Sequence, residues 1–162
     1  MSFQEIYQQQ EPFKVSHMGE PLWEVQHQWQ PAASNESIVQ AQEDIEVPIP
    51  QHIQDIWKIS DGALLYKSLK APDWGWRLIS TDRYLENQHK WRRKFFDEWQ
   101  MQYLAIAELL QPHIAVVWES FTNEVCFLDT SSGGMDAIVI AKSIPEFFDK
   151  LVEHQGGLYW QW

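Results

Sequence analysis

The spacing of apolar residues changes at Asp61-Gly62, and this change constrains the possible fold more than any other feature of the sequence. Before it, apolar residues recur at helical spacing in two segments that Pro48 separates. After it, short apolar runs alternate with turn residues, which is typical of strands. Gly62 can adopt the left-handed conformation with which many helices end. The pattern therefore predicts helices before this point and a sheet after it.

Two helices are predicted on the N-terminal side of the change. Ser34 is a suitable N-cap for the first, and Pro50 fits the first position of the second, where its missing N–H costs nothing. The second helix is expected to run to Asp61-Gly62. The buried stripes would consist of Ile38, Ala41 and Ile45 in the first helix and of Ile53, Ile56 and Trp57 in the second.

The remainder of the chain predicts strands, one long helix and a closing helix. Thr81 would cap the long helix, which runs to about Glu98. Ser143 and Glu146 would form a capping box, in which each side chain satisfies a free backbone N–H of the last helix. The strands are expected at 63–69, 76–79, 103–107, 113–120, 125–129 and 136–141, with turns at Pro72-Asp73 and Thr122-Asn123-Glu124. The long helix would turn Tyr84, Gln88, Trp91, Phe95 and Trp99 to one side, and the last would turn Phe147, Phe148, Leu151 and Val152 inward.

This order of elements predicts an α+β fold: N-terminal helices, an antiparallel β-sheet meander, and a C-terminal helix packed on the sheet. A length of 162 residues suits one domain. Residues 1–33 are rich in Gln and aromatic residues and contain three prolines, so we expect a short helix near 2–9 and then extended chain, together an N-terminal extension packed on the domain. The main domain would span 34–157, and 158–162 would be a short aromatic tail.

Composition argues against several functional classes. The formal net charge is −11, whereas nucleic-acid binders are usually basic because they neutralise phosphates, so direct nucleic-acid binding is not expected. Cys126 is the single cysteine, which excludes an internal disulfide and fits a reducing compartment. The first residues lack the pattern of a signal peptide, and no run approaches the roughly 20 apolar residues that cross a bilayer. We expect a cytoplasmic protein without a membrane partner.

The two ends of the helix–sheet pattern resemble the SUKH superfamily, which includes bacterial immunity proteins and fungal cell-wall synthesis regulators. Ile49-Pro50 stands where the family has Leu-Pro, and Asp61-Gly62 stands in place of Asn-Gly. The closing sequence IVIAKSIPEFFDKLVEH is similar to the family's last strand, Ser-led cap and Phe-rich helix. The resemblance covers about residues 23–154, although the central hairpin lacks the Gly-Asp pair of many relatives. It implies a binding fold without established catalytic residues, whose partners are often secreted toxins, many of them nucleases.

The sequence offers no constellation that predicts catalysis. It lacks a nucleotide-binding glycine loop and a Gly-x-Ser-x-Gly elbow, and its six histidines are scattered, so no enzyme, cofactor or metal site is expected. Cys126 lies on a predicted buried strand, which favours an inert thiol over a nucleophile. The acidic cluster Glu43, Asp44 and Glu46 is interpreted as a solvated face because neighbouring helical residues point apart.

A basic run at 89–94 on the long helix has two interpretations. It is typical of nucleic-acid contact, but it also fits ordinary ion pairs, Glu86 with Lys90 and Arg93 with Asp97, on a solvated helix, and we favour the latter. Among ten tryptophans, Trp74 and Trp76 stand apart, because they flank Gly75 just after a turn. Packing over the hairpin edge is the simpler explanation, but exposed tryptophans often anchor interfaces.

The candidate partner-binding residues are therefore aromatic and acidic side chains near two predicted turns: Asp73, Trp74, Trp76, Glu119 and Glu124. We expect a non-catalytic immunity protein whose acidic, Trp-bearing face covers a basic toxin domain and blocks it. The alternative is a regulatory or scaffolding module of the same fold with an endogenous protein partner.

Overall fold

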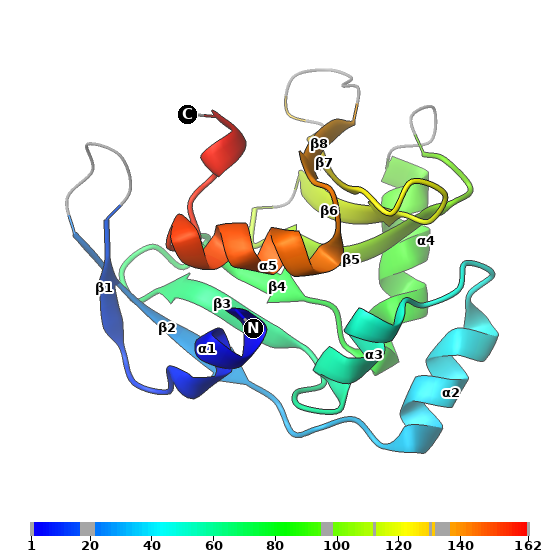
Figure 1. Ribbon diagram of the computed structural model, residues 1–162, viewed down its shortest axis with the longest axis horizontal. Coiled ribbons are helices and arrows are strands. Elements are labelled where there is room, and N and C mark those ends of the chain that lie inside the picture. The colour runs from blue at the N-terminus through cyan, green and yellow to red at the C-terminus, as the bar shows by residue number, and fades with distance from the viewer. Residues whose placement is uncertain are drawn as a thin grey trace.

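The computed structural model describes residues 2–16, 22–94, 99–111, 113–129, 131 and 137–161. Its main element is one sheet of eight antiparallel strands, in which each strand pairs with its neighbours along the chain (Figure 1). The predicted α+β class and antiparallel meander are thus confirmed. The strands are β1 (Phe13–Val15), β2 (Trp23–Trp29), β3 (Ala63–Ser68), β4 (Trp76–Leu78), β5 (Tyr103–Leu109), β6 (Ile114–Glu119), β7 (Val125–Asp129) and β8 (Ile138–Ala141).

Helices cover the two faces of this sheet. Because successive strand residues point to opposite faces, Trp76 and Arg77 of β4 identify them. The ring of Trp76 contacts Phe147 of α5 at 5.8 Å between centroids, whereas Arg77 bonds Glu108 beneath α4. We call the face under α5 the inner face and the face under α4 the outer face. The helices are α1 (Ser2–Gln8), α2 (Asn35–Asp44), α3 (Gln51–Trp57), α4 (Tyr84–Lys94) and α5 (Ile144–Glu153), with 3-10 turns η1 (Thr81–Arg83) and η2 (Tyr159–Gln161).

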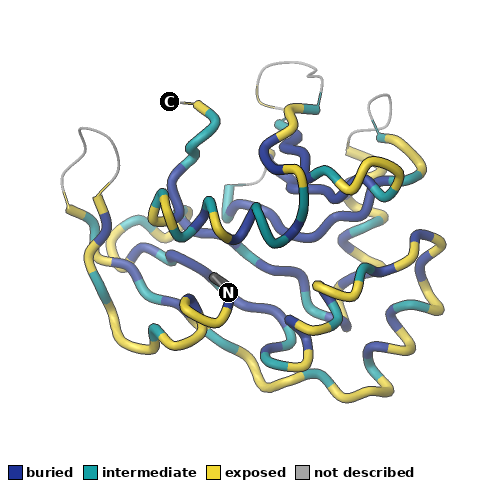
Figure 2. The backbone as a smooth tube through the Cα atoms, viewed as in Figure 1, coloured by how far each residue is buried: buried dark blue, intermediate teal, exposed yellow. Residues whose placement is uncertain are grey.

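The core combines aliphatic residues with several buried aromatic rings and lies on both sides of the central strands, which are buried in Figure 2. On the inner face, Trp160 packs against Phe127 and Trp76, so η2 closes the core beside α5. At the end of the sheet, Trp57 of α3 meets Tyr84 of α4 edge-on at 5.0 Å and donates its Nε1–H to the Ile79 carbonyl. In the part of the chain that the structure describes, no helix has both the length and the apolar character needed to cross a membrane.

Residues 1–33 take part in the sheet itself. The helix predicted near 2–9 is α1, and the extended chain after it forms β1 and β2, with β2 paired to β3 along its length. α1 lies against α5, where the rings of Phe3 and Phe148 meet at 5.3 Å. The N-terminal segment therefore supplies one edge of the same sheet.

Several predicted helix ends differ from those observed. Ser34 caps α2 as expected, with its side chain accepting from Ser37 N–H, and the stripes of α2 and α3 are buried. However, α3 ends at Trp57, and Asp61-Gly62 lies in the turn that follows it, where Gly62 has a φ of +86°. The prediction that this pair ends the helix was wrong, because the chain leaves the helix earlier to bring Asp61 onto Thr81.

Two predicted caps also have different partners. Thr81 does not cap the long helix; its N–H and hydroxyl both donate to Asp61. Ser80 occupies the N-cap position of η1, and its hydroxyl donates to Asp82 instead of capping a backbone N–H. Ser143 caps α5 as predicted, but the Glu146 carboxylate accepts from Lys142 N–H rather than from Ser143. Phe95 and the predicted end of the long helix lie outside the described residues, as does the first residue of the strand predicted at 136–141.

Gly156 is the tightest point between the C-terminal segment and the sheet. Its φ is +79°, its carbonyl accepts from Trp76 Nε1–H at 2.8 Å, and a Cβ there would lie 2.4 Å from Cγ of Tyr66. We expect Gly156→Ala to lower the free energy of unfolding by at least about 2 kcal/mol, because it adds backbone strain to a steric overlap. Gly157→Ala, at a position without positive φ, should change it by less than about 1 kcal/mol. Equal urea midpoints for the two variants would contradict this packing.

A β-bulge between Gln26 and Gln28 places His27 on the inner face, where its Nδ1 accepts from Tyr66 N–H at 3.1 Å. Burial lowers the pKa of His27 from 6.5 to about 4, because the charged imidazolium would lose its hydration. The unfolded state therefore binds more protons between these two values, and stability falls as the pH drops through that window.

The loss on acidification should amount to up to about 3 kcal/mol in the free energy of unfolding, since each pKa unit corresponds to about 1.4 kcal/mol. Urea unfolding at a series of pH values checks it. His27→Asn keeps an acceptor near the Tyr66 N–H but does not titrate. The loss of unfolding free energy on acidification should therefore be smaller in this variant by the part that His27 contributes. His52→Asn, at an exposed histidine, should keep the full slope.

Candidate functional site

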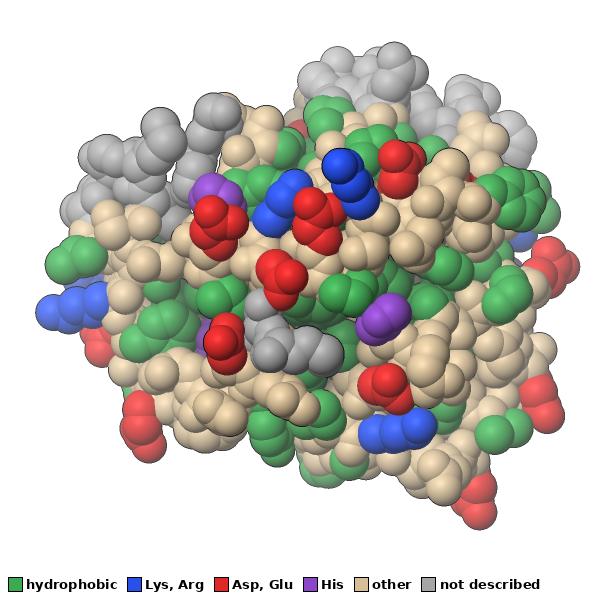
Figure 3. Space-filling model, in the orientation of Figure 1, with side chains coloured by type: hydrophobic (Ala, Val, Ile, Leu, Met, Phe, Trp, Pro, Cys, Tyr) green, Lys and Arg blue, Asp and Glu red, His purple; other side chains and the backbone are tan. Residues whose placement is uncertain are grey.

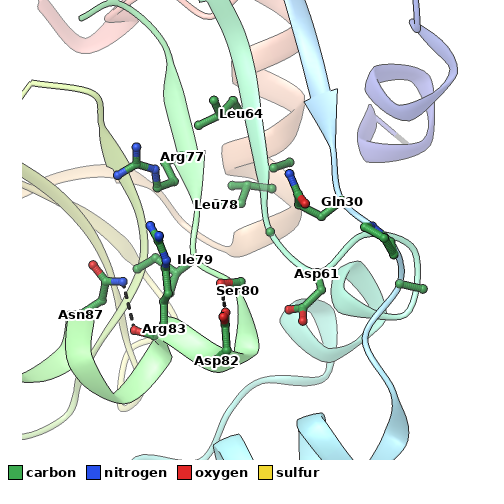
Figure 4. Close-up of a pocket in the computed structure, with 14 residues that line it drawn as sticks. Gln30, Asp61, Leu64, Arg77, Leu78, Ile79, Ser80, Asp82, Arg83 and Asn87 are labelled. Carbon is green, nitrogen blue, oxygen red and sulfur yellow. Dashed lines mark hydrogen bonds between the residues drawn. The ribbon is translucent and has the colours of Figure 1, made fainter.

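A groove of about 570 Å³ lies on the outer face, beside the part of the sheet that α4 covers (Figure 4). One wall is the chain leaving β2, at Gln30, and another is the Asp61-Gly62 turn. The outer-facing side chains of β3 and β4 form its base, and η1 with the start of α4 closes it. We call this feature the β3–β4 groove.

The turn at residues 60–62 holds the walls of the groove together. Ser60 Oγ accepts from Gln30 N–H at 2.9 Å, and Asp61 N–H donates to the Pro31 carbonyl, so the turn is fixed to the chain after β2. On the other side, the Asp61 carboxylate accepts from the N–H and the hydroxyl of Thr81 at 2.7 and 2.8 Å. The residues that were expected only to end a helix therefore form part of the groove.

Glu108 organises the charges next to the groove. Its side chain is 5% exposed, yet it accepts from Arg77 and Lys90 at 2.9 Å each and from the Trp91 Nε1–H at 3.1 Å. Arg77 comes from β4, while Lys90 and Trp91 come from α4, so this carboxylate joins the helix to the sheet. Such charge-assisted bonds satisfy a buried carboxylate that would otherwise be costly.

The basic run on α4 therefore has a different role from the one expected. Lys90 pairs with Glu108 across the sheet face, and not with Glu86 on its own helix, so the predicted Glu86–Lys90 pair was wrong. Sequence spacing along one helix could not reveal a partner on β5. The predicted partner of Arg93, Asp97, lies outside the described residues. The acidic residues Glu43, Asp44 and Glu46 are exposed, as expected for a solvated face.

The first group of predicted partner-binding residues lies at the β3–β4 turn. Asp73 is exposed, and Trp74 is half-buried with its ring 5.7 Å from Trp23. Trp76 has no exposed surface and donates its Nε1–H to Gly156. Trp76 is therefore a core residue and offers no contact surface to a partner; the alternating pleat of β4 turns it inward, toward α5.

The second predicted group lies at the other end of the strands. Leu109 pairs with Trp76 near the β3–β4 turn, whereas Tyr103, at the opposite end of β5, pairs with Glu119 before the β6–β7 turn. Glu119 is buried and turned into its own loop, while Glu124 is half-exposed. The structure therefore does not bring the two groups together into one surface.

The β6–β7 turn is tightly held by its own bonds. The Glu119 carboxylate accepts from the N–H groups of Phe121 and Thr122 at 2.9 Å each, and Trp118 Nε1–H donates to Asn123 Oδ1 at 2.9 Å. Partial burial would raise the pKa of Glu119, but hydrogen bonds from Thr122 and Phe121 outweigh it and hold the pKa below its usual value. Glu119 therefore shapes the turn as an anion.

This turn presents Phe121, which is 84% exposed, at its tip. Sequence reasoning missed this residue. The signal was available, because a large apolar residue between Ser120 and Thr122 in a predicted hairpin turn has no core to enter. A rigid turn that displays an aromatic ring is a feature of interface anchors.

The described residues contain no group of three or more histidine, cysteine or acidic side chains arranged to hold a metal ion. Cys126 is buried on β7, and burial raises the pKa of its thiol to about 11, so the reactive thiolate is disfavoured at neutral pH. The described surface offers an exposed aromatic ring at the β6–β7 turn and a groove with charged side chains on the outer face.

Comparison with known proteins adds no functional assignment. A scan against models of protein families and a search of curated proteins each gave no match for this chain. The functional inference therefore depends on the geometry of the groove and of the turn.

Replacing the carboxylate that joins α4 to the sheet should destabilise the protein. We expect Glu108→Gln to lower the free energy of unfolding by about 2 kcal/mol, because a neutral amide cannot match two partly exposed cations and the buried Trp91 N–H. Glu86→Gln is the matched control on α4, with an expected change within about 0.5 kcal/mol. Chemical denaturation of both variants measures their free energies of unfolding. A larger loss for Glu86→Gln than for Glu108→Gln would refute the pairing described above.

Proposed function

We infer that this chain is a non-catalytic protein-binding domain, of the kind found among SUKH immunity proteins, and that it neutralises a toxin by direct contact. The observation that carries the proposal is the rigid β6–β7 turn with Phe121 at its tip. The proposed partner is a basic domain, such as a nuclease, with an apolar pocket that receives the ring of Phe121. The mechanism is obstruction, since the bound domain would lose access to its substrate.

Preorganisation of the turn supports this role. An exposed phenylalanine gains nothing from the folded state of the isolated chain, because its ring stays in water. Three side chains of the turn, Glu119, Trp118 and Asn123, nevertheless fix the backbone around it. An anchor that is already rigid loses little conformational entropy on binding, which leaves more of the contact energy for affinity.

Charge supports a basic partner. The net charge is −11, and acidic side chains are spread over the face that α1, α3 and α5 form, with lysines between them (Figure 3). Glu124 adds a half-exposed carboxylate beside the anchor. This distribution suits long-range steering of a cationic partner, which raises the association rate at low ionic strength. A standard interface of this kind buries about 1,600 Å² in total.

The order of elements also favours the proposal. The sequence resemblance implied helices, a meander and a Ser-capped aromatic helix. From α2 onward the chain carries such elements in that order, although two strands of the meander, β1 and β2, come before α2. A similar order of elements supports the proposed function less strongly than a shared binding surface would. The β6–β7 turn therefore remains its main support.

Co-expression tests the proposal most directly. The chain is produced with the toxin domain encoded beside its gene, and we expect survival of the cells and a stable complex. Phe121→Ala should weaken the complex by about 2 kcal/mol, which is roughly thirtyfold in the dissociation constant, as for a buried aromatic anchor. Titration calorimetry measures this change, and the association rate should fall as salt is added.

Val39→Ala is the matched control, because Val39 is an exposed apolar residue on α2, 56% exposed and far from the turn in sequence. The affinity of the Val39→Ala variant for the toxin domain should equal that of the parent chain. Cell death despite co-expression, or equal affinity of the Phe121 and Val39 variants, would count against the proposal. A complex with a host protein and no toxin gene nearby would favour the regulatory alternative.

A further inference from the structure

We propose that the β3–β4 groove binds a carboxylate carried on an apolar body. The groove holds about 570 Å³, within the range of roughly 300–1,000 Å³ that is usual for ligand sites. It lies over β3 and β4, and β5 separates it from the hairpin that carries Phe121. It is therefore a second site, and its occupancy does not depend on the proposed function of the β6–β7 turn.

One side of the groove is cationic. Figure 4 shows Arg77 and Arg83 on the same side, with the guanidinium end of Arg83 directed along the groove and Asn87 beside it. Arg83 is exposed and forms no ion pair with the residues that the structure describes. Arg77 is 39% exposed and shares its one anionic partner, Glu108, with Lys90. Two cations on one carboxylate leave a surplus of positive charge at this wall.

The acidic residues of the groove already accept hydrogen bonds from neighbouring hydroxyl and N–H groups. The Asp61 carboxylate accepts two bonds from Thr81, and Asp82 accepts from the Ser80 hydroxyl. In Figure 4 the Asp61 side chain lies across the groove from Arg77. The groove is therefore polarised, with its guanidinium donors on one side and the Asp61 carboxylate on the other. Guanidinium groups bind carboxylates in a planar, two-bond geometry, which makes arginine suited to this task.

Apolar side chains narrow the choice of ligand. Leu64 of β3 is half-buried and lies in the groove next to Arg77 in the strand register, and Pro31 is exposed on the opposite wall. A small inorganic anion would leave these surfaces in water, whereas a ligand with a hydrocarbon portion would cover them. The matching chemistry is a carboxylate next to an alkyl group. A glutamate flanked by leucines in a protein segment has it, and so does a free aliphatic acid.

NMR titration of the isotope-labelled chain separates these sources. The probes are hexanoate with hexanamide as its neutral match, and the blocked peptide Leu-Glu-Leu with Leu-Gln-Leu as its match. We expect both carboxylates, and neither amide, to shift the side-chain Nε–H signals of Arg77 and Arg83 in a saturable way. Tighter binding of the peptide would identify a protein segment as the occupant, and tighter binding of hexanoate would identify a free acid.

Arg83→Gln should weaken carboxylate binding about tenfold, because one charged donor pair is lost. Arg93→Gln changes an exposed arginine of α4 that lies outside the groove, and it should leave carboxylate binding unchanged. Arg77→Lys keeps a positive charge beside Glu108 but removes the planar guanidinium group, which binds a carboxylate through two bonds. It should therefore also weaken carboxylate binding while the chain stays folded. Equal shifts with acids and amides, or equal affinity of the Arg83 and Arg93 variants, would overturn the inference. Phe121→Ala should not affect it, so the two proposals fail independently.

Discussion

The bond from Thr81 to Asp61 fixes the geometry on which both the fold and the groove depend. Asp61 follows α3, and Thr81 begins the turn into α4, so their contact joins two segments that the β3–β4 hairpin separates in the sequence. Ser60 extends the connection to the chain after β2. With these three segments fixed at one corner, α4 starts at a defined place. Its Lys90 and its buried Trp91 then reach the Glu108 carboxylate. An unsatisfied Thr81 N–H at the same corner would cost free energy instead.

Glu108 shows how one buried charge can serve both packing and recognition. Its carboxylate accepts from the buried indole N–H of Trp91. The same carboxylate orients the guanidinium group of Arg77 at the edge of the groove. A hydrophobic residue at this position would pack α4 on β5 as well, since buried ion pairs are often no more stabilising than well-packed apolar groups. What the carboxylate adds is a fixed direction for the guanidinium group. The polar network therefore contributes the shape of the surface more than the stability of the core.

Local patterns predicted the elements of this fold well and their partners poorly. Ser34, Ser143 and the stripe of α3 follow from spacing along one element, and each was found where the spacing placed it. The partners of Thr81 and Lys90 lie on other elements, so their bonds depend on tertiary packing that one-dimensional spacing does not contain. Sequence spacing also left the direction of Trp76 open, because the pleat decides which of Trp76 and Arg77 faces α5. At the β6–β7 turn, the sequence analysis named Glu119 and Glu124 but not Phe121, the exposed residue between them.

The meander also sets an order of events for the folding chain. Each strand after β1 pairs with the strand that precedes it, so the sheet can grow in sequence order as the chain lengthens. The pairings β2–β3 and β4–β5 also enclose helices, so they form after more of the chain than a tight hairpin needs. α1 is the exception. It packs on α5, and Ser16 N–H donates to Gln155, so the first helix of the sequence has to wait for the last one. During synthesis, the aromatic underside of α1 and the inner face of β2 would stay uncovered until α5 and Gln155 leave the ribosome, and in that interval the nascent chain most needs protection from other hydrophobic surfaces.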